Sequence, residues 1–173
     1  MTVQTAKLQI RVRNRFLDCF VCFAGFQCKA ELAVNLSGTD KVMGVCIYAR
    51  LDAEQDRALL DYYAIAPEKR NYGYGSRGLE ALLKKFKNHK YIFEIETQDE
   101  KAENAEERKR RKAFYLRNGL QETGLFVNVY DTDFEILTPD GELTFWEYVD
   151  FLREVMYEEY VQILRPTLIA MKK

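Results

Sequence analysis

The sequence predicts a mixed α/β (α+β) domain in which helices flank a mostly antiparallel β-sheet. Residues 30–50 and 125–137 each hold two apolar segments around a polar turn, which is typical of β-hairpins. Between them, an apolar strand at 59–66 precedes a segment with leucines at helical spacing. Hairpins separated by strand–helix units favour one sheet covered by helices.

The first elements follow from alternation and from turn residues. Ser37–Asp40 separates apolar segments at Ala30–Leu36 and Lys41–Arg50, which we expect to pair as a hairpin. Leu59–Ala66 (LLDYYAIA) is apolar enough for a buried strand. Pro67 should end that strand, because proline has no N–H to donate to a neighbouring strand.

The middle of the chain combines helical and strand patterns. A helix is predicted from the spacing of Leu79, Leu82, Leu83 and Phe86. Tyr91–Glu96 (YIFEIE) is predicted to be a strand. A charged run, Glu100–Lys112, then leads into a helix at Ala113–Gly119, whose glycine is a typical C-cap.

The last third is predicted to contain a second hairpin and one long helix. The hairpin strands are Leu125–Tyr130 and Phe134–Leu137 around Asp131–Asp133, followed by a turn at 139–141. Thr144 and Glu147 have the spacing of a capping box. Apolar residues then continue at helical spacing, so we expect a helix over 143–165, with the stripe Phe145, Val149, Leu152, Met156 and Ile163.

Length and composition favour a single domain over residues 1–173, with 1–29 as an atypical N-terminal segment. Hydrophobic residues make up 47% of the chain, enough to bury a core. The 26 basic and 27 acidic residues nearly cancel, so no chain-wide field favours nucleic acid or an anionic membrane as a partner. No stretch approaches the roughly 20 apolar residues that a membrane span needs.

The cysteines raise the question of a metal or redox site. Cys19 and Cys22 form one C-x-x-C, while Cys28 and Cys46 stand apart and His89 is the single histidine. Tetrahedral zinc needs four such ligands, and the sequence offers no second pair. We therefore expect no metal, and reduced thiols in a cytoplasmic protein.

The stretch RNYGYGS, from Arg70 to Ser76, follows the strand at 59–66 and opens the next helix. Gly73–Gly78 formally matches the dinucleotide fingerprint G-x-G-x-x-G, and Glu94 lies 21 residues after Gly73. Six residues separate the strand from the first glycine, however, whereas a dinucleotide-binding turn is tight. Glycines at a helix N-terminus also suit a pyrophosphate in other families, since backbone N–H groups can converge on it.

Two motifs together resemble the GNAT N-acetyltransferase superfamily. Arg70-x-x-Gly73-x-Gly75 is similar to its cofactor loop, and FYLRNGL at 114–120 is similar to its F-Y-x-x-x-G-F, with Leu120 in place of Phe. Arg108 departs from an asparagine that the family often carries. The resemblance implies acetyl-CoA as co-substrate and a sheet splayed between its two central strands. It places these residues against the cofactor: Tyr63, Ala64, Ile65, Arg70, Asn71, Tyr72, Gly73, Tyr74, Gly75 and Ser76.

Acetyl transfer from a thioester to an amine needs a base and an acid. Tyr115 matches the family tyrosine beside the cofactor sulfur, and a phenol with an ordinary pKa of about 10 can donate a proton there. Glu94, in a segment similar to the family's L-E-V strand, is the preferred base, with Asp61 and Glu96 in reserve. Burial of any of these carboxyls would raise its pKa toward a useful range.

The charged run has three interpretations. Its basic end, Arg108–Lys112, is compatible with a nucleic-acid patch or with a site for the CoA 3′-phosphate. We favour a solvated helix in which Glu106 and Glu107 pair with Arg110 and Arg111 four residues later.

The sequence thus predicts direct acetyl transfer to a primary amine of a small molecule or peptide. The family lines its acceptor pocket with two helices after the first strand, but only about 29 residues precede Ala30 here. We therefore expect an acceptor side that is truncated, or rebuilt by a partner subunit or by the C-terminal helix, and the sequence does not identify the acceptor. The sequence leaves open whether the protein forms a homodimer. The alternative is a non-catalytic module that binds acyl-CoA or a protein partner, and a dinucleotide-dependent enzyme is a more distant one.

Overall fold

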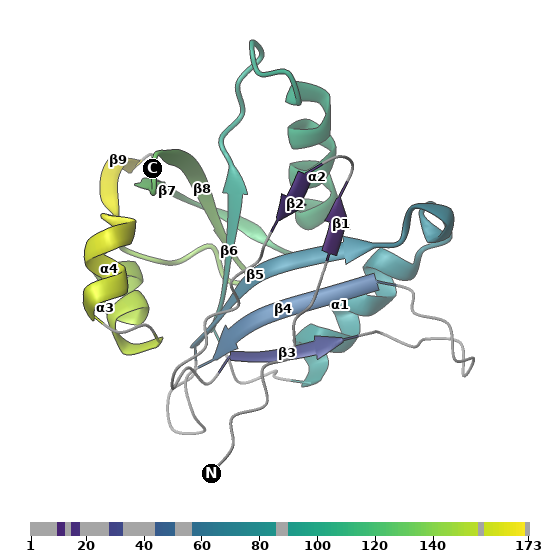
Figure 1. The fold of residues 1–173 in the computed structure, drawn as a ribbon, viewed down its shortest axis with the longest axis horizontal. Helices are drawn as coiled ribbons and strands as arrows, with labels where there is room; N and C mark the ends of the chain where they lie inside the picture. Colours follow the sequence, from purple (N-terminus) through teal and green to yellow (C-terminus); the bar gives the residue numbers. More distant parts are fainter. Residues whose placement is uncertain are drawn as a thin grey trace.

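The structure, a computed structural model, describes residues 57–85, 90–155 and 158–171 and four strands before them. One seven-stranded sheet has the order β3-β4-β5-β6-β8-β7-β9 (Figure 1). Within it, β5 and β6 are parallel and every other neighbouring pair is antiparallel. The predicted mixed, mostly antiparallel sheet is therefore confirmed.

The strands of this sheet are β3 (Cys28–Leu32), β4 (Gly44–Arg50), β5 (Arg57–Ile65), β6 (Lys90–Glu96), β7 (Gln121–Val129), β8 (Thr132–Thr138) and β9 (Thr167–Met171). The helices are a 3-10 turn at Pro67–Lys69, α1 (Tyr74–Lys85), α2 (Ala105–Arg117), α3 (Phe145–Val155) and α4 (Glu158–Leu164). In the N-terminal segment, β1 (Ile10–Val12) and β2 (Arg15–Leu17) form a separate antiparallel pair.

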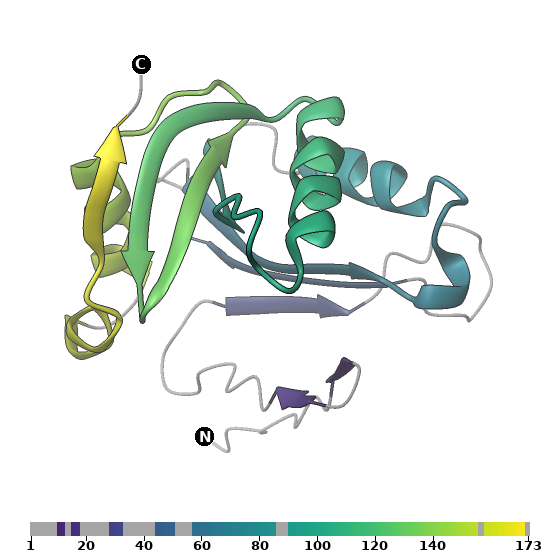
Figure 2. The ribbon, with the colours of Figure 1, turned by 90° about the horizontal axis from the view of Figure 1, so that it is seen from above.

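Two apolar layers lie on opposite faces of the sheet. Helices α1 and α2 share one buried cluster with Leu60 and Phe93, and Figure 2 shows these helices together on one side of β3–β5. Helices α3 and α4 share the other cluster with Leu59 and Ile92. Because adjacent strand residues point to opposite faces, strands buried on both sides are apolar throughout. This explains why the sequences of β5 and β6 do not alternate cleanly.

Several expected elements have different bounds. The second hairpin turns at Tyr130 and Asp131, whose φ angles of 48° and 60° suit a two-residue turn tighter than the predicted one. Helix α2 begins at Ala105, so much of the charged run is helical. It ends as predicted before Gly119, which has φ 92°. The turn at 37–40, the pair Cys19 and Cys22, and His89 lie outside the described residues.

The C-terminal region differs from the prediction of one helix over 143–165. Helices α3 and α4 are separate, and Val149, Leu152 and Val161 belong to one buried cluster. On a straight helix, the nine residues from Leu152 to Val161 make about two and a half turns at 3.6 residues per turn, so the two side chains would face opposite sides. Strand β9, which we did not predict, pairs antiparallel with β7.

The sheet divides at its centre. Pairing between β5 and β6 runs from Arg57↔Lys90 to Leu60↔Phe93 and ends there. Both strands continue, β5 to Ile65 and β6 to Glu96, and they diverge in Figure 1. We call the space between these two strand ends the wedge, and the Leu60↔Phe93 pair its vertex. The expected splay between the central strands is present.

Candidate functional site

The glycine-rich loop lies just beyond the end of β5. After the 3-10 turn, Asn71 and Gly73 take positive φ angles of 67° and 76°, and α1 begins at Tyr74. Glycine adopts this conformation without the steric cost that a Cβ imposes, and asparagine tolerates it better than most residues. The residue types of the loop therefore match the backbone path that they must follow.

The main-chain amides of this loop face no acceptor within the described part of the chain. The Arg70 N–H donates to the Pro67 carbonyl (3.3 Å) and the Arg77 N–H to the Gly73 carbonyl (3.1 Å). Between these two bonds, the described residues offer no hydrogen bond to the N–H groups of residues 71–76. The N-terminus of α1 adds its partial positive charge at the same place. This arrangement suits a pyrophosphate.

Gly75 is needed for a different reason than Gly73. A Cβ at Gly75 would lie 3.2 Å from Cε2 of Phe114 and 3.6 Å from Cγ1 of Ile65, whereas at Gly73 it would meet nothing within 4 Å. Gly75 thus lets α2 approach the first turn of α1. The Tyr63 hydroxyl donates to the Gly75 carbonyl (2.6 Å), and its ring stacks on Phe114 with centroids 6.3 Å apart. The two sequence motifs are therefore in direct contact.

The Arg70 side chain makes a hydrogen bond within the loop region. Its Nε donates to the carbonyl of Ile65 at the end of β5 (3.2 Å), and its own N–H is used within the 3-10 turn. The side chain therefore ties the loop to the strand before it. Residues 71–76, rather than Arg70, supply the amides available to a ligand.

Two candidate catalytic residues flank the vertex from opposite faces of the sheet. Tyr115, 8% exposed, packs against Phe93 with ring centroids 5.4 Å apart, on the α1–α2 face. Glu94 is the next residue of β6 and points to the α3 face, where its Oε1 accepts a hydrogen bond from the Tyr148 hydroxyl (2.6 Å). Asp61 follows Leu60 in β5, but its side chain lies outside the described residues.

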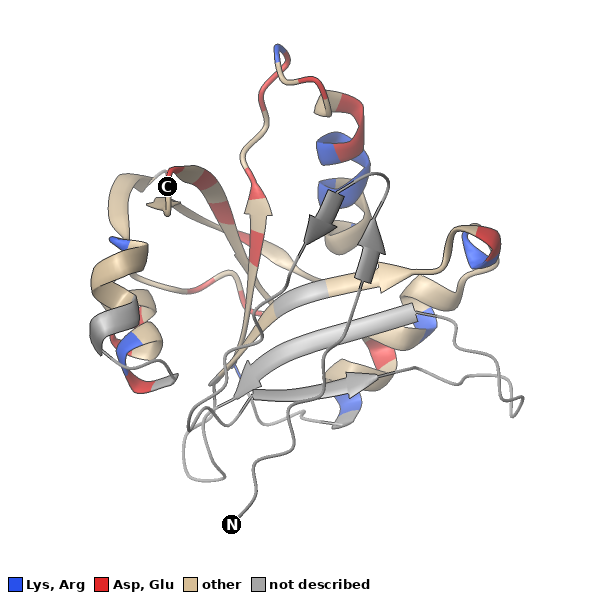
Figure 3. Cartoon of the chain, in the orientation of Figure 1, with Lys and Arg blue, Asp and Glu red and all other residues tan. Residues whose placement is uncertain are grey.

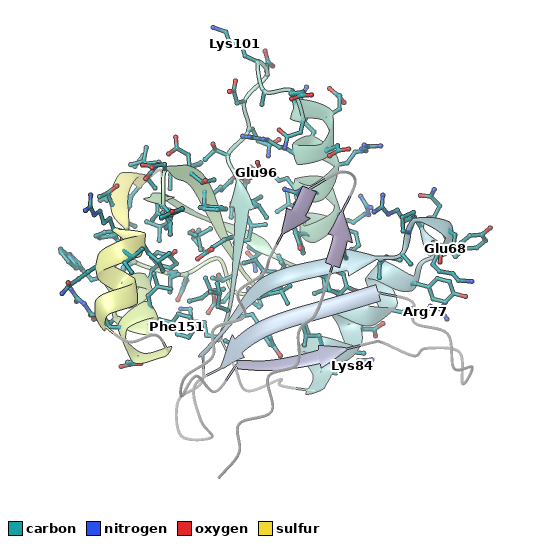
Figure 4. The ribbon with its side chains drawn as sticks, in the orientation of Figure 1. Glu68, Arg77, Lys84, Glu96, Lys101 and Phe151 are labelled. Atoms are coloured by element: carbon teal, nitrogen blue, oxygen red, sulfur yellow. The ribbon has the colours of Figure 1, made fainter. Side chains whose placement is uncertain are left out.

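Glu96, the reserve base, is held in an ion-pair network at the end of β6 (Figure 4). It lies 3.0 Å from Arg108 and 2.7 Å from Arg111. Burial would raise the pKa of this carboxyl, but hydrogen bonds from Arg111 and Asn104 and the two positive charges outweigh burial and hold the pKa below its ordinary value. A carboxylate so paired is a poor proton acceptor.

Arg108, at the position where the family often has asparagine, has a structural role. It pairs with Glu96, and it also donates from Nη1 to the Thr97 carbonyl and from Nε to Oδ1 of Asn104, both at 2.8 Å. These bonds fasten the start of α2 to the end of β6.

Lys109, Arg111 and Lys112 pair with residues that we did not predict. Lys112 binds Glu122 of β7 and Glu135 of β8, with Nζ 2.7 Å from Oε1 of Glu135. Burial raises the pKa of Glu135, which is 2% exposed, and the nearby Glu122 adds to this while Lys112 opposes it. Figure 3 shows the mixture of charges along α2. The expected pairs of Glu106 and Glu107 with Arg110 and Arg111 are wrong, since Arg111 binds Glu96 and Glu106 binds Lys109.

A groove of about 490 Å³ runs from the loop between α1 and the C-terminal end of α2. It begins at Ser76 and contains three cationic side chains and one acidic one; its lining residues are Ser76, Arg77, Glu80, Leu83, Lys84, Arg117 and Asn118. Lys84 is paired with Glu80 (2.6 Å), while Arg77 lies over the ring of Tyr74, 4.6 Å from its centroid. The groove is large enough for a small ligand and carries a net positive charge.

Within the described ranges, no three His, Cys, Asp or Glu side chains lie close enough to hold a metal ion. No helix in the same ranges combines the length and the apolar character that crossing a membrane demands.

A sequence profile described as "Acetyltransferase (GNAT) family" matches residues 13–119, more than half of the chain. The chain belongs to the GNAT acetyltransferase family. It is accordingly an N-acetyltransferase, as the loop and the FYLRNGL motif had indicated. A comparison with curated proteins finds no match.

Solved GNAT structures are similar in fold. A protein assigned to the GNAT family from Bacteroides thetaiotaomicron superposes with a TM-score of 0.50 at 22% identity, over 72% of this chain and 68% of that one. A GNAT acetyltransferase from Elizabethkingia anophelis with acetyl-CoA bound superposes with a TM-score of 0.47 at 17% identity, over 58% of this chain and 69% of that one. The ribosomal-protein-S18-alanine N-acetyltransferase of Escherichia coli superposes with a TM-score of 0.44 at 22% identity, over 58% of this chain and 62% of that one.

Two residues of the candidate site are not predicted from the sequence in the roles that the structure gives them. Phe114 belongs to the FYLRNGL motif, and its ring is the surface against which Gly75 packs. The other residue is Tyr148. The signal that could have found it is its place beside Val149 on the apolar stripe of α3, because a tyrosine buried in a core needs a partner for its hydroxyl.

Proposed function

We propose that this GNAT enzyme transfers the acetyl group of acetyl-CoA directly to a primary amine of a small molecule or peptide. The observation that carries the proposal is the loop at residues 71–76, whose N–H groups have no acceptor in the described structure and lie at the open end of the wedge. Together the two features suit a long phosphorylated co-substrate, since the amides would bind its pyrophosphate while its arm enters the wedge.

The co-substrate fits three regions that adjoin one another. The amides of residues 71–76 would bind the pyrophosphate, and the main chain of Tyr63–Ile65 would pair with the pantetheine arm as an added strand. The groove lined by Arg77 and Arg117 would take the nucleotide end with its 3′-phosphate. This position replaces Arg108–Lys112 as the candidate site for the 3′-phosphate, since Arg108, Arg111 and Lys112 have carboxylate partners.

Acetyl-CoA supplies the activated acetyl group as a thioester. Glu94, or Asp61 beside the same vertex, takes a proton from the attacking amine at a carboxylate oxygen. The Tyr115 hydroxyl donates a proton to the departing sulfur from the opposite face of the sheet. Acid and base thus act from separate sides and do not neutralise each other.

The test compares Tyr115→Phe with Tyr130→Phe, a control in which the altered tyrosine is 68% exposed in the hairpin turn. We expect Tyr115→Phe to lower kcat by about 100-fold, within the usual range for loss of a general acid, while the Kd of acetyl-CoA stays within about twofold. Thiol release over a panel of amines measures the first quantity and calorimetry the second. An unchanged kcat in Tyr115→Phe would remove Tyr115 from the mechanism.

The same panel addresses the alternative of a non-catalytic module. Thermal stabilisation by acetyl-CoA with thiol release on at least one amine supports the proposed enzyme. Stabilisation without release on any small-molecule or peptide amine would favour a binding module, and stabilisation by NAD instead would favour a dinucleotide site.

A further inference from the structure

We propose that Tyr148 of α3 is a positioning residue that fixes the Glu94 carboxylate at the vertex of the wedge. The inference rests on the proposed function, because it concerns the base of that reaction. It goes further by giving the C-terminal helix pair a part in catalysis and by adding a structural reason for preferring Glu94 to Asp61.

The contact is short and comes from a well-buried group. The Tyr148 hydroxyl donates to Oε1 of Glu94 at 2.6 Å, a distance typical of hydrogen bonds to an ionised carboxylate. Tyr148 is 0% exposed, while its neighbours Val149, Phe151 and Leu152 are buried and hold α3 against the sheet. The hydroxyl therefore has little freedom to move, and it restricts the carboxylate that it binds.

The bond also favours one protonation state of each group. Burial raises the pKa of Tyr148 well above its ordinary value, and the negative charge and hydrogen bond of Glu94 raise it further. The phenol therefore stays protonated and remains a donor over the pH range of an assay. A donor bound to a carboxylate favours its ionised form and lowers its pKa. Glu94 would thus be kept ready to accept a proton.

Two charged residues at neighbouring positions of the sheet have ion-pair partners of their own. Glu96, two residues along β6, is bound by Arg108 and Arg111. On the neighbouring strand β8, Ile136 lies opposite Glu94, and Glu135 points to the other face toward Lys112. Tyr148 reaches Glu94 directly from α3, through the hydrogen bond of its hydroxyl.

The central experiment measures the pH profile of kcat/KM for Tyr148→Phe. Loss of the donor raises the pKa of Glu94, so the acid limb of the profile should move to higher pH by about one unit. The loss of kcat/KM should approach tenfold at the acid end of the profile and disappear on the plateau, where Glu94 is ionised in both proteins. The Kd of acetyl-CoA should not change.

Tyr91→Phe is the matched control. Tyr91 is also buried, and its hydroxyl donates to the Leu82 carbonyl (3.0 Å) on the other face of the sheet. Its removal loses a comparable bond without affecting Glu94, so the acid limb should stay in place. If Tyr148→Phe fails to fold, a difluorotyrosine at position 148 keeps the shape and strengthens the donor, and the acid limb should then move to lower pH.

Glu94→Gln separates the two proposals. If Glu94→Gln is inactive and the Tyr148 variants shift the acid limb, positioning is supported. If Glu94→Gln is inactive but the Tyr148 profiles superimpose on that of the unaltered enzyme, positioning is overturned and Glu94 remains the base. If Glu94→Gln is fully active, Glu94 is not the base and the positioning proposal fails with that assignment, while acetyl-CoA binding still tests the loop.

Discussion

Gly75→Ala tests the contact by which the two GNAT motifs meet. The new Cβ would lie 3.2 Å from Cε2 of Phe114 and 3.4 Å from its Cζ. Carbon atoms are best separated by about 3.5–4.0 Å, so the ring must move by a few tenths of an ångström. Phe114 stacks on Tyr63 and meets Tyr115 edge-on with centroids 5.3 Å apart, so its displacement affects both.

The expected cost follows from two opposing effects. Overpacking of this kind costs about 1–3 kcal/mol. Alanine offsets up to about 1 kcal/mol of this, since it favours a helix more than glycine does. We therefore expect a net loss of about 1 kcal/mol in the free energy of unfolding. The affinity for acetyl-CoA should weaken about tenfold, because the first turn of α1 shifts with its amides.

A double-mutant cycle with Phe114→Leu measures the contact directly by urea denaturation and calorimetry. The smaller side chain should rescue Gly75→Ala, giving a coupling of about 1 kcal/mol. Gly73→Ala provides the comparison: its φ of 76° costs an alanine about 1–2 kcal/mol, and Phe114→Leu should not relieve this. Additive effects of Gly75→Ala and Phe114→Leu would refute the reasoning.

Three further changes test other parts of the structure. Lys112→Met leaves Glu135 buried without its cation and should lower the free energy of unfolding, measured by urea denaturation, by about 3 kcal/mol. Lys109→Met removes an exposed pair and should lower it by less than about 0.5 kcal/mol. Equal losses in the two variants would contradict this. The folded-state pKa of Glu96 is lowered, so its pairing stabilises the fold above the unfolded pKa of about 4.3. Glu96→Gln should therefore destabilise at pH 7, and this effect should disappear as the pH falls through the folded pKa. Arg117→Ala should raise the KM of acetyl-CoA severalfold and that of the 3′-dephospho form little; equal changes would exclude the groove as the phosphate site.

The centre of the fold could be predicted because its signals are contiguous. Strand β5, the loop and α1 follow one another, and Pro67, Gly73 and the leucine stripe of α1 each act over a few residues. The glycine cap of α2 is equally local, with the Leu120 N–H bonded to the Tyr115 carbonyl (3.2 Å). Such features depend on backbone conformation and helical spacing, which the sequence shows directly.

The features that could not be predicted depend on contacts between residues that are distant in the sequence. The Tyr148–Glu94 bond joins residues 54 apart, and Lys112 binds Glu135 23 residues away, so neither partner is visible from local spacing. Strand β9 is exposed at an edge and is defined by its pairing with β7. The separation of α3 from α4 likewise follows from the shared core that both helices cover. Local propensity cannot specify which distant surface an apolar stripe will meet.

The most direct test of the central claim is a crystal structure of the complex with acetyl-CoA. We predict pyrophosphate oxygens within about 2.7–3.2 Å of backbone nitrogens among residues 71–76, and the pantetheine arm along Tyr63–Ile65 inside the wedge. Acetyl-CoA bound elsewhere, with those nitrogens making no contact to phosphate, would contradict it.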